Sequence, residues 1–175
     1  MSFKIRSIYF TAAISAVLTV AAVASAKYKA DNSKIVFHAK GPGGLAIEGK
    51  SSTLKISEDD KTVTFLTYMN TLDTGIAKRN EHMLKRFKAS ENPDIKLTVA
   101  RDSVDPKKGG TVPGTLNFHG VEKPVKVSYS VDGKHVAAHF GFNVKDHGIT
   151  DDDVCEMHVC AKPDVTVNVD FDLKD

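Results

Sequence analysis

The fold of this chain is best indicated by residues 114–131, which read GTLNFHGVEKPVKVSYSV. Apolar and polar side chains alternate on both sides of a short polar stretch, and a period of two is typical of β-strands with one dry and one wet face. Gly120 can adopt a positive φ, and Pro124, which lacks an N–H, fits a strand start or an edge. The segment therefore predicts a β-hairpin connected by residues 119–124, whose apolar face needs a cover.

The same alternation recurs through most of the chain. Together with the hairpin, it predicts eight strands, the others covering residues 35–39, 45–56, 63–69, 95–99, 136–144 and 165–173. Gly49 is a candidate bulge position. Helical spacing is convincing only over residues 76–87, where Asp73 or Thr74 would cap the helix. A set of this kind predicts an antiparallel sandwich or barrel, and we favour an eight-stranded barrel because it encloses every apolar face and removes exposed edges.

The first 26 residues have the pattern of a secretory signal peptide. Lys4 and Arg6 precede an apolar run over residues 8–23, and Ala24-Ser25-Ala26 forms a small-residue cleavage pattern. The apolar run is short for an uncleaved membrane anchor, which is the alternative. We therefore expect cleavage after Ala26, a periplasmic or secreted protein, and a single mature domain over residues 27–175 that is long enough to form a sizeable core.

The charge balance argues against a nucleic-acid-binding protein. The chain carries 24 Lys and Arg against 22 Asp and Glu, and loss of Lys4 and Arg6 with the signal leaves the two signs balanced. Nucleic-acid binding requires clustered positive charge. The small cluster of Lys85, Arg86 and Lys88 is expected to be a solvated helix face.

The inward-facing apolar side chains are the main candidate site. A small barrel can be filled by such side chains or can hold one small ligand, and the pattern alone leaves both open. The set comprises Phe37, Leu54, Phe65, Leu97, Leu116, Phe118, Val127, Tyr129, Phe140, Phe142, Val167, Val169 and Phe171.

Three motifs together resemble the YceI-like family of secreted bacterial proteins. Thr71-Leu72-Asp73-Thr74-Gly75 is followed by Arg79 and His82, then by Asn92-Pro93-Asp94-Ile95, and then by residues 114–125. The resemblance extends over about residues 28–173, and residues 116–125 are its most specific part. It implies a lipocalin-like barrel of eight antiparallel strands with one short helix flanking its mouth.

The resemblance also implies a function. Family members enclose a long apolar chain in a tunnel, so the expected role is periplasmic binding, transport or storage of a polyisoprenoid, an isoprenoid quinone or a fatty-acid-like amphiphile by a protein that is not an enzyme. No cofactor is expected other than a bound isoprenoid lipid. The expected partner is a long-chain isoprenoid or acyl lipid, with transient membrane contact and a monomeric or homodimeric state left open.

The chain departs from the family pattern in places that affect the ligand more than the fold. Asn80 stands where an aspartate is common, and Lys88-Ala89-Ser90 stands where a second aromatic residue and an acid are frequent. Asp73, Arg79 and His82 are expected to meet at the helix start, either to hold a polar headgroup or, as we favour, to anchor the helix, because buried charges need partners. His119 is expected to bond within its own turn.

Cys155 and Cys160 are the two cysteines of the chain. In an oxidising compartment a disulfide is the default expectation, provided that the four intervening residues turn back. Metal binding is the sharper alternative, because Met157 and His158 lie between the cysteines, and His147 and Asp151–Asp153 lie just upstream. A reactive redox pair is another. The alternative function is therefore a periplasmic redox or copper-handling protein using this loop. Hydrolytic motifs are lacking, and no metal site or catalytic residue is assigned.

Overall fold

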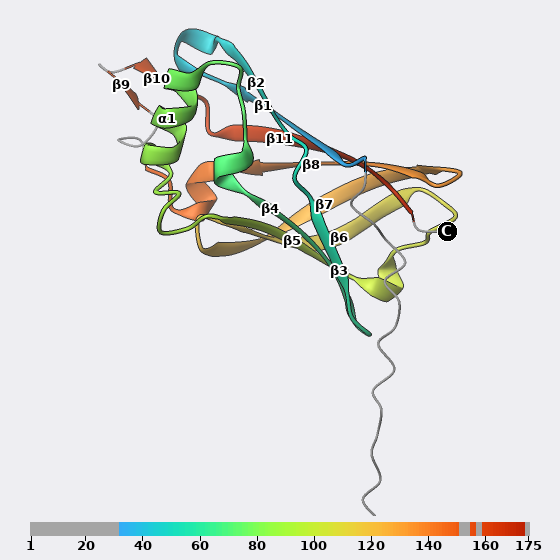
Figure 1. Cartoon of the computed structure of the whole chain (residues 1–175). Helices are drawn as coiled ribbons and strands as arrows, with labels where there is room; N and C mark the ends of the chain where they lie inside the picture. The colour runs from blue at the N-terminus through green and yellow to red at the C-terminus, as the bar shows by residue number, and fades with distance from the viewer. Residues whose placement is uncertain (1–31, 151–154, 157–158, 174–175) are drawn as a thin grey trace, which may run out of the picture.

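The computed structural model describes residues 32–150, 155–156 and 159–173 (Figure 1). The expected signal peptide lies outside the described residues. The described strands are β1 (Lys34–Lys40), β2 (Ala46–Ser51), β3 (Lys55–Glu58), β4 (Thr62–Tyr68), β5 (Asp94–Ala100), β6 (Gly110–Phe118), β7 (Val121–Asp132), β8 (His135–Asn143), β9 (Cys155–Glu156), β10 (Val159–Cys160) and β11 (Asp164–Asp172). The helix α1 spans Ala77–Arg86, and the 3₁₀ turns are η1 (Pro42–Gly44), η2 (Met69–Thr71), η3 (Arg101–Ser103) and η4 (Val144–His147).

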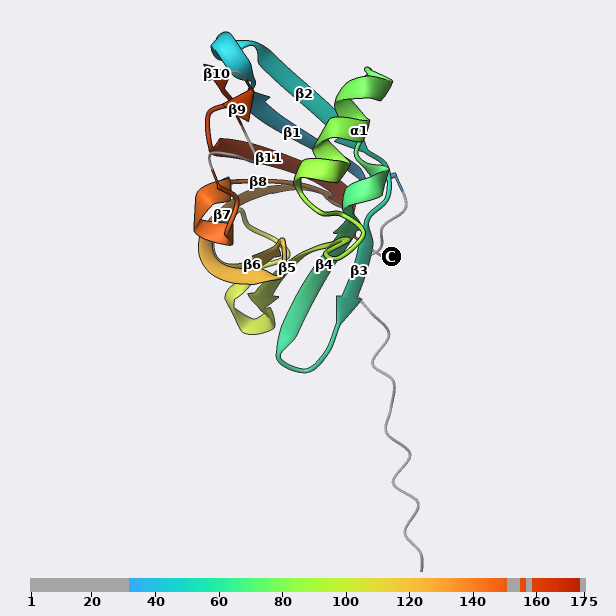
Figure 2. The same ribbon diagram turned by 90° about the vertical axis from the view of Figure 1, so that its left-hand side faces the viewer.

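Among the described residues, nine strands form one antiparallel sheet in the order β2-β1-β11-β8-β7-β6-β5-β4-β3. The sheet curls around an interior, and α1 lies at one end of it, next to the short β9–β10 hairpin (Figures 1 and 2). The lipocalin-like fold class with one flanking helix is thus confirmed, although the sheet is a partly open barrel with nine strands instead of eight. No helix in the described part of the chain is both long and apolar enough to cross a membrane.

The additional strand arises because the strand predicted over residues 45–56 is interrupted at residues 52–54. Its first half, β2, pairs with β1, and its second half, β3, pairs with β4. The two edge strands of the sheet are therefore consecutive pieces of chain. Gly49 is not a bulge, because it stands opposite Phe37 in an uninterrupted register. It is needed because the Phe37 ring occupies the space that a Cβ at Gly49 would take.

Hydroxyl groups and one backbone bridge close the seam between the two edge strands. Lys50 and Asp73 exchange two backbone hydrogen bonds of 2.8 Å each. The hydroxyls of Ser51 and Thr71 are 2.9 Å apart, and the Thr67 hydroxyl donates to the Thr53 carbonyl at 2.6 Å. These contacts hold the segment between η2 and α1 across the seam, which places α1 at the end of the curled sheet (Figure 2).

The hairpin quoted first has a tighter turn than predicted. His119 and Gly120 have φ values of 54° and 75°, and Phe118 pairs with Val121. Positive φ at both central residues is typical of the type I′ hairpin turn. Pro124 therefore lies within β7, opposite Thr115, in the part of β7 that precedes its pairing with β8. Its missing N–H faces an unpaired edge, as the sequence suggested.

Two histidines connect this turn to η4. The Nδ1 atom of His119 lies 3.3 Å from the His147 carbonyl, so His119 bonds outside its own turn, contrary to expectation. His147 is 1% exposed and its Nδ1 atom lies 2.8 Å from the Val121 carbonyl, to which it donates because a carbonyl can only accept. Its ring stands edge-on to Phe118 and Phe142. His147 is therefore a core residue with a satisfied hydrogen bond.

Candidate functional site

The curled sheet encloses an apolar cavity of about 530 Å³. Every strand of the main sheet except β3 contributes to its lining, and α1 closes one side. The volume falls in the range of about 300–1,000 Å³ that is usual for small-molecule sites. The structure places all thirteen apolar residues singled out from the sequence along this cavity: Phe37, Leu54, Phe65, Leu97, Leu116, Phe118, Val127, Tyr129, Phe140, Phe142, Val167, Val169 and Phe171.

Part of the lining is also close-packed core. Leu116 is 1% exposed. Phe118 packs edge-on against Phe87, with ring centroids 5.7 Å apart, and in a tilted arrangement against Phe142, with ring centroids 5.2 Å apart. The same side chains therefore do both things that the sequence left open. They pack against one another, and they also border the empty space of the cavity.

The two ends of the cavity differ in their polar groups. The end beside α1, called the mouth here, is lined by basic residues, whereas Asp105, which follows η3, lies at the opposite end, called the floor. At the floor the Tyr129 hydroxyl lies 2.9 Å from the Asp105 amide, from which it accepts, and 3.4 Å from the Asp105 carbonyl, to which it donates. The basic residues at the mouth are Lys40, Lys78, Arg79, His82, Arg86 and Lys162.

Sequence reasoning singled out only Arg79 and His82 from this basic group as site residues. Lys40 ends β1, Lys162 precedes β11, and the Lys162 amide donates to the Lys40 carbonyl at 2.7 Å. Lysines at strand ends look like ordinary solvated residues in a sequence. Only knowledge that β1 pairs with β11 would have shown that these two lysines lie close together.

Asp73 does not join Arg79 and His82, although the sequence suggested a group of three. The Asp73 carboxylate accepts from the Asn80 side-chain amide at 2.7 Å and from the Gly75 amide at 2.8 Å, and these bonds hold the pKa of Asp73 below its usual value. Within the described residues no hydrogen bond or ion pair links Asp73 to Arg79 or His82. Those two side chains instead line the mouth.

Asn80 is the residue that anchors the start of the helix. Its side-chain oxygen accepts from the amide and the hydroxyl of Thr74, at 2.9 and 2.6 Å, while its nitrogen donates to Asp73. The predicted caps Asp73 and Thr74 are wrong, because Ile76 is the N-cap residue and no side chain caps it. The signal that could have identified Asn80 was its departure from the family pattern. A second carboxylate here would repel Asp73.

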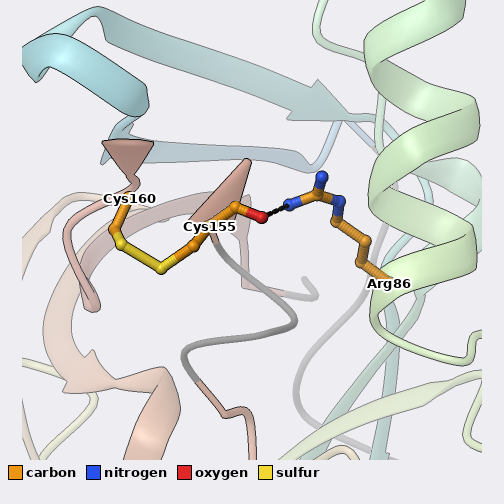
Figure 3. Close-up of a disulfide and its surroundings, with 3 residues drawn as sticks. All are labelled: Arg86, Cys155 and Cys160. Atoms are coloured by element: carbon orange, nitrogen blue, oxygen red, sulfur yellow. Dashed lines mark hydrogen bonds between the residues drawn. A yellow bond between two sulfur atoms is a disulfide. The ribbon is translucent and has the colours of Figure 1, made fainter. Parts of the chain in front are cut away.

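Cys155 and Cys160 form the predicted disulfide, with Cα atoms 3.9 Å apart on the paired strands β9 and β10. Figure 3 shows that Arg86 extends from α1 to the same hairpin, where its Nη1 atom donates to the Cys155 carbonyl at 3.2 Å. The disulfide therefore holds together a hairpin that contacts the end of the helix. Arg86 is accordingly a contact residue, and the solvated helix face expected for it was wrong.

Nothing in the described structure supports the metal alternative. The described residues contain no cluster of three or more His, Cys, Asp or Glu side chains that could hold a metal ion. His147, which lies upstream of the cysteines and was considered as a metal ligand, is buried and donates to the Val121 carbonyl. Asp151–Asp153, Met157 and His158 lie outside the described residues.

Comparison with known proteins identifies the family. The model of the YceI-like domain matches residues 11–173, so the chain belongs to the YceI-like domain family. No match was found among curated proteins.

Solved structures share the fold at low sequence identity. A polyisoprenoid-binding domain from Saccharophagus degradans, implicated in plant cell wall breakdown, superimposes with a TM-score of 0.65 at 13% identity, covering 84% of this chain and 97% of that one. BcnA of Burkholderia cenocepacia gives 0.62 at 13% identity, with coverages of 82% and 97%. A mutant YceI protein of Campylobacter jejuni gives 0.55 at 16% identity, with coverages of 74% and 85%. At these identities the similarity shows the fold.

Proposed function

We propose that this member of the YceI-like family binds a long-chain apolar ligand, such as a polyisoprenoid, an isoprenoid quinone or a fatty-acid-like amphiphile, in the cavity of its curled sheet. The observation that carries the proposal is the apolar cavity of about 530 Å³. The 13% identical domain from Saccharophagus degradans, described as polyisoprenoid-binding, adds support at the level of the fold. Carriage or storage of the ligand, without chemical conversion, is the role that we infer.

The physical basis of binding is the transfer of a hydrocarbon chain from water into the cavity. Each buried methylene contributes about 0.8 kcal/mol, so ten of them would contribute about 8 kcal/mol, which corresponds to a dissociation constant near the micromolar range before binding costs. The cavity presents aromatic and branched aliphatic side chains to such a chain. No directional polar contact is needed along its length.

A pair of variants on β11 tests whether the interior is the binding site. Val167 lines the cavity, whereas the adjacent Thr166, of nearly the same size, is exposed on the opposite face. We expect Val167→Trp to fill part of the cavity and to weaken binding of the neutral probe N-phenylnaphthylamine by at least about tenfold. Thr166→Trp should leave probe binding unchanged. Equal effects of the two variants, or no binding by the unaltered protein, would contradict the proposal.

The natural ligand can be identified directly. We expect that organic extraction of protein purified from its native host, followed by mass spectrometry, will yield a long-chain isoprenoid or acyl lipid. The Val167→Trp protein purified in parallel should yield less of it. Absence of any extractable lipid, combined with a failure to bind the apolar probe, would exclude the carrier role.

We also propose that the protein is periplasmic or secreted after cleavage at Ala26. The support is the signal-peptide pattern of residues 1–26 and a disulfide, which forms and persists mainly in oxidising compartments. N-terminal sequencing of the protein from fractionated cells tests this, with Lys27 expected as the first residue. No observation on the described residues favours the redox or copper-handling alternative.

A further inference from the structure

The basic and the acidic residues that line the cavity lie at opposite ends of it. At the mouth, Lys40, Lys78, Arg79, His82 and Lys162 border an otherwise apolar cavity, and this set is called the basic rim here. Among the described residues the one acidic residue of the lining is Asp105, at the floor. A ligand that enters from α1 therefore meets positive charge first and hydrocarbon beyond it.

The charge of the basic rim is not neutralised within the described part of the protein. No ion pair or side-chain hydrogen bond there involves any of its five members. Nearby carboxylates are engaged elsewhere, because Asp73 accepts from Asn80 and Gly75, and Asp164 accepts from the Asn143 side chain at 3.1 Å. Glu81 does not line the cavity. Like charges gathered at the entrance of a low-dielectric cavity raise the local concentration of opposite charge.

Arg79 is the most telling member of the basic rim. It is half-buried, and it lies one helical turn from both Ile76 and Met83, which also line the cavity. A guanidinium keeps its charge at any physiological pH and presents a planar fork that matches carboxylate or phosphate oxygens. Arg79 stands among the apolar residues that line the cavity at the end beside α1.

We infer that the ligand is an anionic amphiphile, whose carboxylate or phosphate headgroup is held by the basic rim, with Arg79 and Lys78 of α1 as its main contacts, while its tail extends toward the floor. This inference rests on the proposed function and adds the headgroup class and the direction of insertion. Neutral chains bind in the same cavity but without the headgroup contacts. Arg86 is not assigned to the headgroup, because it already donates to the Cys155 carbonyl.

The groups at the floor also favour one orientation of the ligand in the cavity. The Tyr129 hydroxyl and the backbone of Asp105 satisfy each other there, and the Asp105 carboxylate accepts from the Lys107 amide at 2.8 Å. Among the described residues no cationic side chain lines the floor, so an anionic headgroup there would lack a partner of opposite charge, whereas an apolar tail needs none. Insertion of the tail first is therefore favoured by both ends of the cavity.

The test compares two ligands that share a tail and differ in headgroup charge. Laurate and lauryl alcohol compete with N-phenylnaphthylamine for the purified full-length mature protein, and the two displacement constants are expressed as a ratio. We expect laurate to displace the probe at about tenfold lower concentration than the alcohol. The preference should decrease as ionic strength rises, because the basic rim is largely solvent-accessible.

Two charge-matched double variants, one near the start of α1 and one at and just beyond its end, locate the effect. Lys78→Gln with Arg79→Gln removes two cations that line the mouth, and we expect the ratio to fall close to one. Lys85→Gln with Lys88→Gln removes two exposed cations that do not line the cavity, and we expect the ratio to be retained. Lauryl phosphate, run in parallel, shows which anionic headgroup is preferred.

The outcomes separate this inference from the proposed function. If probe and alcohol bind but laurate has no advantage, the anionic headgroup is excluded while the carrier function stands. If nothing binds, the carrier function fails first. Vesicles with and without phosphatidylglycerol separate a membrane surface from a single amphiphile. Loss of vesicle binding in the Lys78/Arg79 variant, with its laurate preference intact, would assign the rim to membranes and overturn the inference.

Discussion

The wall of the sheet and the helix that covers its mouth line the same cavity but are built differently. Wall residues such as Leu116, Val63 and Phe171 are 1–3% exposed, whereas none of the ten residues of α1, all of which the structure describes, is buried. The helix is attached by the Asn80 side chain, by Phe87 against Phe118, and by Arg86 through the β9–β10 hairpin. The buried side chains are therefore concentrated in the wall, whereas α1, called the cover here together with the β9–β10 hairpin, is held by a few separate contacts.

The largest effect is expected in the wall. Leu116→Ala removes a fully buried side chain of β6 and should lower the free energy of unfolding by about 2–5 kcal/mol. Urea denaturation followed by circular dichroism measures it. The neighbouring Thr115 is exposed, and Thr115→Ala should cost less than about 0.5 kcal/mol. A similar loss in both variants would mean that the alternation of β6 does not define the core.

A glycine in the wall gives the next effect. Gly49→Ala places a methyl group where the Phe37 ring lies, so the ring must move toward the cavity, at a cost of about 1–3 kcal/mol and with weaker binding of the apolar probe. Gly141→Ala is the matched control on β8, because a Cβ there would meet nothing closer than the Val165 carbonyl at 3.6 Å. Denaturation and probe titration of both proteins provide the comparison.

Removal of the disulfide tests how much the β9–β10 hairpin beside α1 contributes to stability. Cys155→Ser with Cys160→Ser opens a loop of short sequence separation, for which the chain-entropy estimate is a loss of about 2 kcal/mol at most. The unaltered protein in reductant should behave like the variant. We expect the loss to stay below that of Leu116→Ala, and a larger loss would show that the hairpin belongs to the core and not to the cover.

The smallest effect is expected at the start of the helix. Asn80→Asp replaces the amide that donates to Asp73 with a second carboxylate, and we expect a decrease in Tm on the order of a few degrees at neutral pH. The bonds to Asp73 lower its pKa, so the stability they provide is present above the unfolded value of about 3.9 and is lost as the pH falls through the lower folded value.

The pH dependence of Tm provides a control for the Asn80→Asp prediction. In Asn80→Asp the two carboxylates become neutral as the pH falls below about 4, so the difference from the unaltered protein should shrink there. Asn80→Ala, which loses the bonds but adds no charge, should show a smaller gap at neutral pH. A difference in Tm that is the same at every pH would contradict the assigned repulsion.

Much of the wall could be predicted from the sequence, because a residue in a strand faces the interior or solvent according to the parity of its position. All thirteen inward residues line the cavity for this reason. The interruption at residues 52–54 was missed, although it leaves a trace in the pattern, because the cavity-lining positions change from odd at Ile47 of β2 to even at Leu54. What maintains it is a set of hydroxyl contacts, such as Thr67 to the Thr53 carbonyl, that depend on residues distant in sequence.

The contacts that hold α1 and the β9–β10 hairpin were less predictable. They are made by single polar side chains, and which nearby group each of them bonds to follows no periodic pattern in the sequence. Asp73 was expected to meet Arg79 and His82 but bonds to Asn80, which lies one residue beyond Arg79. The basic rim was missed in part because Lys40 and Lys162 come together only when β1 and β11 pair.

The seam also bears on how copies of this protein behave when crowded. An exposed edge strand is a template for adding strands from other molecules, which leads to aggregation. At Lys50 of β2 both backbone hydrogen-bonding groups are already taken by Asp73 of the same chain. A foreign strand that added along β2 would have to break those two bonds and displace the segment leading into α1. The loop that holds the helix in place thus also protects an edge of the sheet against self-association.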